Sequence, residues 1–132
     1  MNFEQQLVRD FHTAIGDTLP LHPGCPSDTV CLLRYKLIRE EYEEAANEIL
    51  RGGDIAFVMG DCDLAAVAKE LADLMYVVYG TALAFGIDLE PVFKAVHENN
   101  MTKVGGPRRP DGKVLKTDKY VAPDIASVLA QQ

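Results

Sequence analysis

The sequence has few cysteines, and basic residues are outnumbered by acidic ones. Cys25, Cys31 and Cys62 show no CxxC spacing, which argues against a disulfide scaffold or a zinc site and favours the reducing cytoplasm. Thirteen basic residues stand against twenty acidic ones, giving a formal net charge of −7. We therefore expect no nucleic acid and no anionic membrane as the main partner.

The sequence also lacks a long hydrophobic run and a phosphate-binding P-loop. The longest stretch without charge, residues 74–87, is too short to span a bilayer comfortably. The N-terminal residues are charged too early for a signal peptide. Without a P-loop, the usual ATPase route is not available. These absences predict a cytoplasmic protein that binds no membrane.

What is present is helical periodicity over the first hundred residues. Helices are expected over 3–15, from about 28 to 50 or 51, from a cap at 61 or 63 to 85, and from a cap at 88 to about 100. From residue 104 the chain is rich in glycine, proline and basic residues, with a possible hairpin turn at 111–112 and a short final helix. We expect one domain, 1–132, with a helical body (1–103) and a tail (104–132). Its fold class is all-α, a four- to five-helix bundle with an irregular basic tail.

The second predicted helix concentrates acidic residues. Within nine positions it carries Glu40, Glu41, Glu43, Glu44 and Glu48. All but Glu43 continue a stripe that is apolar at the start of the helix, and such a stripe normally faces the core. Glu43 lies off the stripe and is expected to pair with Arg39 at the surface.

The third predicted helix is apolar on nearly every side, so we expect it to be buried in a bundle or an interface. Its Glu70 and Asp73 are three residues apart and share a face. Two carboxylates on a buried helix are costly unless something compensates them. Salt bridges to Arg34 or Lys36 would do so. A cation shared with the acids of the second helix would explain both helices at once.

A shared cation would bring Glu41, Glu44, Glu70 and Asp73 together. Ligands that are all carboxylate oxygens suit Mg²⁺, with Mn²⁺ able to substitute. A di-iron bundle would need Glu-x-x-His, which no histidine here provides. Magnesium held in this way keeps positions open for water and phosphates, and Glu40 at the edge of the cluster is placed to take a proton from the attacking water.

The pattern Glu40-Glu41-x-x-Glu44 followed by Glu70-x-x-Asp73 resembles the signature of the all-α nucleoside triphosphate pyrophosphohydrolases. That superfamily includes MazG-like proteins, dimeric dUTPases, dCTP pyrophosphatases and phosphoribosyl-ATP pyrophosphohydrolases. The stretches FHTAIG (11–16), DGKVLK (111–116) and residues 72–106 are similar to its small MazG-like branch, in which dUTP preference has been described.

The resemblance implies Mg²⁺-dependent cleavage between the α and β phosphates of a nucleoside triphosphate, most readily dUTP, as house-cleaning of the nucleotide pool. It also implies metal ligation by the four acids named above, water activation by Glu40, and contacts to sugar and phosphate from Asn100 and Lys103. The alternatives are the same chemistry on dCTP, dGTP or phosphoribosyl-ATP, or a non-catalytic helical binding or dimerisation module.

Each remaining candidate for substrate binding could instead be an ordinary surface or structural residue. Lys113 and Lys116 could reach the phosphates as point charges or simply keep the tail soluble. His12 could touch the base or sugar or be a structural histidine. Arg108 and Arg109 are expected at the surface. Because the third helix is apolar on more sides than a four-helix monomer can cover, we expect a homodimer or a dimer of dimers.

Overall fold

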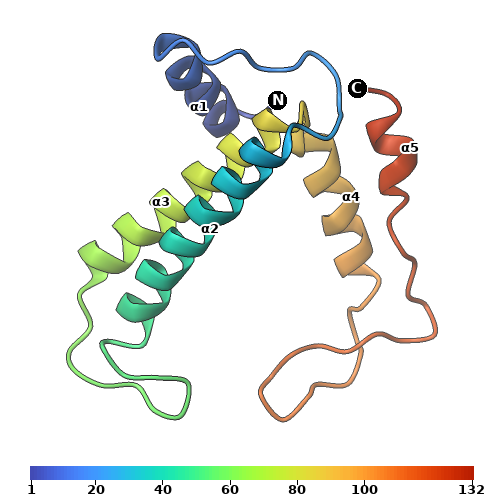
Figure 1. Ribbon diagram of the computed structural model, residues 1–132. Coiled ribbons are helices and arrows are strands. Elements are labelled where there is room, and N and C mark those ends of the chain that lie inside the picture. Colours follow the sequence, from blue (N-terminus) through green and yellow to red (C-terminus); the bar gives the residue numbers. More distant parts are fainter.

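The structure is a computed structural model that describes all 132 residues, and it contains five helices and no strand (Figure 1). The helices are α1 (Phe3–Ala14), α2 (Asp28–Ile49), α3 (Leu64–Ala84), α4 (Leu89–Met101) and α5 (Ile125–Leu129). The predicted all-α class is confirmed, and the observed boundaries lie close to the predicted ones.

Capping side chains explain where the helices begin. The side chains of Ser27, Asp63 and Asp88 accept hydrogen bonds from the first turns of α2, α3 and α4. Gly86 follows the end of α3 with a φ of 68°, and a Cβ there would lie 2.2 Å from the carbonyl oxygen of His22. Only glycine allows both the left-handed conformation and this close approach of two chain segments.

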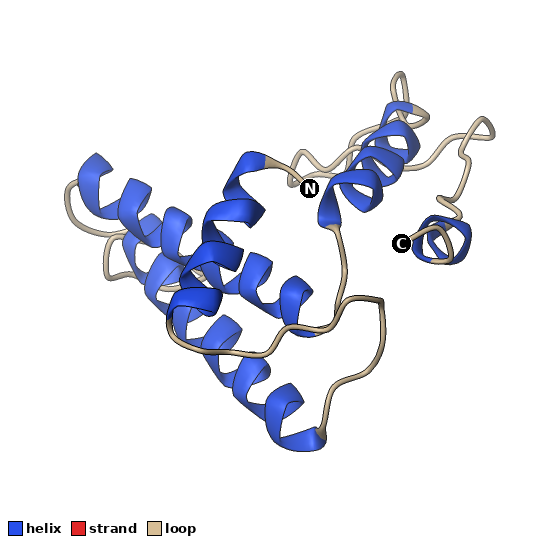
Figure 2. Cartoon of the chain, turned by 90° about the horizontal axis from the view of Figure 1, so that it is seen from above, coloured by secondary structure: helices blue, strands red, loops and turns tan.

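The long helices α2 and α3 run antiparallel and side by side, and α1 packs against α3 near its C-terminal end (Figures 1 and 2). After α3 the chain turns, so that α4 leads away from this pair and α5 returns beside α4 (Figure 1). The molecule therefore has two arms: α2 with α3, and α4 with the tail.

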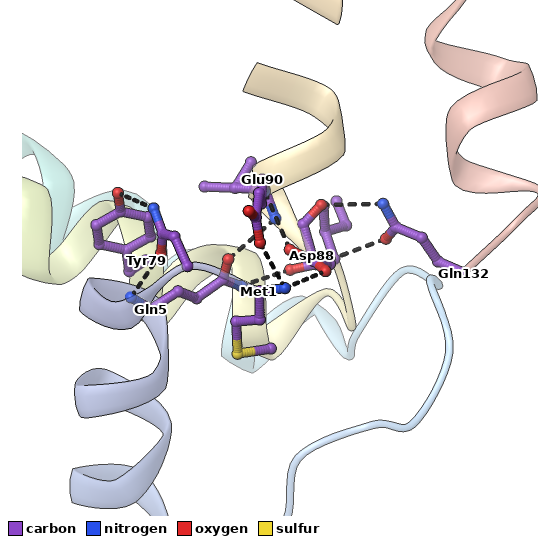
Figure 3. A network of polar contacts seen from close by, with 9 residues as sticks. Met1, Gln5, Tyr79, Asp88, Glu90 and Gln132 are labelled. Atoms are coloured by element: carbon purple, nitrogen blue, oxygen red, sulfur yellow. Dashed lines mark hydrogen bonds and ion pairs between the residues drawn. The ribbon is translucent and has the colours of Figure 1, made fainter. Parts of the chain in front are cut away.

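A polar network joins the arms at the turn between α3 and α4 (Figure 3). The buried Gln5 side chain donates to the Ile87 carbonyl (2.7 Å) and accepts from the Leu89 N–H (3.0 Å). The Gln132 amide bonds both the N–H and the C=O of Asp88. These contacts tie α1 and the last residue of the chain to the start of α4.

The chain leaves much of its apolar surface uncovered. Only nine residues are buried, and the apolar ones among them are Val8, Ala45, Ala82 and Leu83. The accessible surface is 9331 Å², whereas a compact monomer of 14.5 kDa exposes about 6,900 Å². Within one chain α3 is only partly covered, because several of its apolar side chains face outward, and its predicted burial in an interface stays a prediction.

The uncovered surface forms stripes rather than scattered spots. On α1 and its C-cap the exposed large apolar residues are Phe3, Leu7, Phe11 and Ile15, while the buried residues of the helix are Gln5, Val8 and His12. On α3 the exposed set includes Leu64, Leu71, Met75 and Val78. Both sets recur at helical spacing, so each forms a continuous apolar face.

The tail has the predicted irregular character. A single bridge between Arg108 and Val114, with the Arg109 N–H donating to the Lys113 carbonyl (2.7 Å), closes the turn expected at Asp111 and Gly112. No strands form around it. No one helix of the chain is long and apolar enough to cross a membrane; α3 and α4 reach that length and apolarity only together, across a 114° bend.

Candidate active site

Carboxylates from α2 and α3 meet where the two helices face each other. Glu41, Glu44 and Glu70 each offer an oxygen, and these oxygens lie within 4.8 Å of one another. Glu41 and Glu70 are partly buried and Glu44 is exposed. We call these three residues the acid cluster. The i,i+3 spacing of Glu41 and Glu44 places both on the same side of α2, the side that faces Glu70 on α3.

Two oxygens of the acid cluster have no partner. The Oε2 atoms of Glu41 and Glu70 are buried and accept no hydrogen bond. Burial, followed by repulsion from Glu44, raises the pKa of Glu41 above its ordinary value, and burial followed by repulsion from Glu70 raises the pKa of Glu44. An all-oxygen donor set with unsatisfied buried atoms fits a hard divalent cation.

Asp73 lies outside the acid cluster and forms an ion pair with Lys69. The Lys69 Nζ lies 2.7 Å from Asp73 Oδ2 and 3.0 Å from Glu70 Oε1. The hydrogen bond to Asp73, and then that to Glu70, raises the pKa of Lys69. The expected alternative of salt bridges to Arg34 or Lys36 is wrong, since the lysine that pairs with both acids is on α3 itself, one turn before Asp73.

A polar hollow of about 450 Å³ lies beside the acid cluster. Its lining residues are Glu40, Glu43, Glu44, Asn47, Glu48 and Glu70. Glu40 is exposed at this edge. Glu43 accepts from Arg39 Nε at 2.8 Å, and this surface pair was predicted from the sequence. No hydrophobic residue lines the hollow and five of its six residues are glutamates, so it suits water and cations, and it could accept phosphate oxygens only through a bound cation.

Basic residues gather in a second hollow of about 650 Å³, at the end of α4 and in the tail. Asn100, Lys103 and Lys113 all line it, and the Lys103 ammonium donates to the Asn100 side chain at 2.8 Å. Arg108, expected at the surface without a role, lines it as well. Lys116 does not, because its ammonium lies over the ring of Tyr120, 4.3 Å from the centroid. We call this the basic hollow.

The acid cluster and the basic hollow belong to different arms of the chain. In both views the loop after α4 lies apart from the α2–α3 pair (Figures 1 and 2). His12 is in neither place: it is buried on α1, with its Nδ1 2.6 Å from Asp17 Oδ2. One chain therefore does not bring all the predicted site residues together.

Sequence reasoning gave Arg34 no role except as an ion-pair partner for the acids. In the structure it is 9% exposed, and its Nε is buried without a partner. No spacing rule could have singled it out, because its surroundings come from α1 and α3.

Comparison with known proteins identifies the chain's relatives. Residues 8–100 match the phosphoribosyl-ATP pyrophosphohydrolase family, a stretch that includes the second half of α1, all of α2 and α3, and most of α4, but not the tail. A comparison with curated proteins gave no match. This family consists of hydrolases that cleave the pyrophosphate linkage of a nucleotide. Since the match spans well over half of the sequence, the chain belongs to the phosphoribosyl-ATP pyrophosphohydrolase family, within the MazG-like all-α nucleoside triphosphate pyrophosphohydrolase superfamily.

Proposed function

We propose that this protein is a Mg²⁺-dependent nucleoside triphosphate pyrophosphohydrolase that releases a nucleoside monophosphate and pyrophosphate. The observation that carries the proposal is that Glu41 on α2 and Glu70 on α3 belong to one carboxylate cluster and each has a buried oxygen without a hydrogen-bond donor. Family membership supplies the class of reaction. A non-catalytic module would have no need of these unsatisfied charges.

The surroundings of the acids support the roles that we propose for them. Glu41, Glu44 and Glu70 would hold the cation, and Asp73 would join them once Lys69 gives way. Bound Mg²⁺ supplies charge neutralisation and polarisation at the phosphorus under attack. Glu40, exposed at the edge of the polar hollow and not part of the acid cluster, would accept the proton of the attacking water.

The triphosphate needs cationic contacts that the acid cluster does not provide. Lys103, Lys113 and Arg108 in the basic hollow are suited to phosphate oxygens as charged donors, with Asn100 beside them. Lys116 would have to leave Tyr120 to contribute. Because the basic hollow lies on the other arm, we propose that it serves the acid cluster of a second copy in a homodimer or dimer of dimers. We also propose that residues 1–132 form a single MazG-like pyrophosphohydrolase domain and that the protein works in the cytoplasm.

We propose dUTP as the substrate, because the DGKVLK stretch lies outside the matched residues and is similar to the small MazG-like branch. The second candidate is phosphoribosyl-ATP, favoured by the family match itself. dCTP and dGTP are further candidate substrates, because the same cleavage chemistry would apply to them.

A substrate panel tests the proposal. The four nucleotides would be incubated with the protein and Mg²⁺, and pyrophosphate release would be measured. We expect release to be fastest with dUTP and to stop in excess chelator. Release in chelator, or none from any of the four, would refute the function; faster release from phosphoribosyl-ATP would refute the substrate choice alone.

A further inference from the structure

Arg34, a buried arginine without an ion-pair partner, lies on α2 seven residues before Glu41 of the acid cluster. Arg34 takes part in none of the chain's seven ion pairs, and its Nε has no hydrogen-bond partner. Burial lowers its pKa. A guanidinium removed from water with donors unused costs free energy unless a ligand satisfies it. The charge of Asp17 acts on Arg34, but the two form no ion pair, so the guanidinium still has donors free for a ligand.

The neighbours of Arg34 hold its side chain against the backbone of α3. A Cβ built on Gly80 of α3 would lie 2.9 Å from Arg34 Nη1 and 3.0 Å from His12 Nε2. The glycine thus lets both nitrogens approach the α3 backbone. His12 is fixed by its contact with Asp17, which joins the loop after α1 to this cluster. Arg34, His12 and Asp17 form one ordered polar group between three segments.

A hollow of about 430 Å³ opens beside this group. Arg34 and Asp17 are its only charged lining residues, and the remaining wall is mostly apolar, with Leu19, Pro20, Leu33 and Ala84 among its members. A concave apolar site with a few convergent polar groups is typical of small-molecule binding. Arginine offers donors and the aspartate offers an acceptor. A flat ring whose edge carries both a carbonyl oxygen and an N–H matches this pair.

The separation between this hollow and the acid cluster matches the length of a nucleotide from its α-phosphate to its base. Arg34 precedes Glu41 by seven residues, which places it on the same face of α2 about 10 Å along the axis. Gly80 follows Asp73 by the same interval on antiparallel α3. A nucleotide whose α-phosphate lies at the acid cluster extends its sugar and base over a separation of this kind.

We propose that the hollow beside Arg34 binds the nucleobase of the substrate, with Arg34 donating to a ring carbonyl and Asp17 accepting from an N–H of the base. This inference rests on the proposed nucleotide function. The proposed contact from Arg34 selects bases with a carbonyl oxygen, such as uracil, cytosine and guanine, and disfavours adenine, which has none. Arg34 is thereby a specificity-determining residue of the site.

The test compares ligands with and without a base. Non-hydrolysable α,β-imido analogues of dUTP, of dATP and of base-free deoxyribose triphosphate are titrated calorimetrically into the full chain with Mg²⁺. We expect Arg34→Gln to weaken the dUTP analogue roughly 10- to 100-fold, the range for losing a hydrogen bond from a charged donor. The base-free ligand should bind as before, and the wild-type preference for dUTP over dATP should disappear. Lys36→Gln removes an exposed charge from the same helix and should change nothing.

A second variant leaves Arg34 intact. Ala84→Phe fills the hollow from α3 and should weaken the dUTP analogue while sparing the base-free ligand. Equal loss of both ligands in Arg34→Gln would mean a phosphate contact or a damaged fold, and unchanged binding in either variant would mean a structural arginine; each overturns the inference. Binding does not depend on turnover, so a wild type that discriminates between ligands yet releases no pyrophosphate refutes only the proposed function.

Discussion

Glu40 and Glu41 are adjacent in the sequence but have different surroundings. Glu41 has a buried oxygen without a partner, and burial raises its pKa, whereas Glu40 is exposed at the edge of the polar hollow. We predict that Glu40→Gln lowers turnover roughly 100- to 10,000-fold, the usual contribution of a general base, while still binding metal and nucleotide. Glu41→Gln should weaken metal binding directly.

Calorimetric titration of Mg²⁺ with a non-hydrolysable triphosphate, run beside turnover, separates the two roles. Glu43→Gln is the matched control, because Glu43 is occupied by Arg39 at the surface. Loss of metal binding in Glu40→Gln together with its retention in Glu41→Gln would reverse the assignment.

Lys69 competes with a cation for Glu70 and Asp73. Its ammonium is bonded to both carboxylates, although its side chain is 65% exposed and the pairs are screened by solvent. We predict that Lys69→Gln tightens Mg²⁺ binding about 2- to 5-fold, the scale of an exposed ion pair. Lys36→Gln, a lysine outside the site, is the control in the same titration. Weaker binding in Lys69→Gln alone would mean that the lysine supports the site.

The raised pKa values of Glu41 and Glu44 predict a pH dependence of stability. Relative to the ordinary value of 4.5, the folded state of each group holds its proton more tightly than the unfolded state. Their contribution is therefore fully present below the ordinary pKa and is lost as the pH rises through the raised pKa. In chelator, the Tm should fall over this window, and less so in Glu41→Gln. A slope unchanged by that substitution would contradict the assignment.

The position of a single residue can be predicted from the sequence where helix geometry alone determines which neighbours it meets. The sequence predicts that Glu41, Glu44 and Glu70 converge, since i,i+3 spacing and apolar stripes fix the sides of α2 and α3. It does not predict that Lys69 takes Asp73, nor that Arg34 lies against Gly80. Those contacts depend on the relative rotation and register of packed helices, which spacing does not encode.

Whole elements were more predictable than their faces. Capping residues such as Ser27, Asp63 and Asp88 mark the helix starts, and the structure begins its helices after them. The face that α1 buries is not the apolar stripe but the side with Gln5, Val8 and His12. Periodicity identifies an apolar face without saying whether the same chain or a second copy covers it.

The tail is the element whose role is least tied to the family, since it lies outside the matched residues. Lys113 lines the basic hollow, whereas Lys119 is exposed in the same tail and does not. We predict that Lys113→Gln lowers kcat/KM roughly tenfold, the order of a lost charged hydrogen bond to phosphate. Lys119→Gln, assayed alongside, should retain activity. Equal effects would assign the tail a general charge contribution only.

At the scale of the molecule, the uncovered stripes of α1 and α3 predict association. The chain exposes about 2,400 Å² more than a compact monomer of its mass would, by the usual scaling of surface with mass. We predict a dimer or tetramer by light scattering at micromolar concentration. Val78→Arg places a charge in the exposed stripe of α3, eight residues along the helix from Glu70, and should weaken association roughly 30-fold or more.

Ile55→Arg, in an exposed loop, is the control for a general effect of added charge. If the basic hollow acts in a partner's site, the dissociated Val78→Arg protein should also lose activity. A wild type that stays monomeric, or a dissociated variant with full activity, would contradict this view of the assembly.

The central claim is that the acid cluster directs metal-dependent cleavage between the α and β phosphates. Phosphorus NMR of dUTP turnover tests it most directly, because it identifies both products in one spectrum. With Mg²⁺ we expect dUMP and pyrophosphate from the wild type, and neither from Glu41→Gln or in excess chelator. Release of dUDP and orthophosphate, or unchanged pyrophosphate release from Glu41→Gln, would contradict the claim.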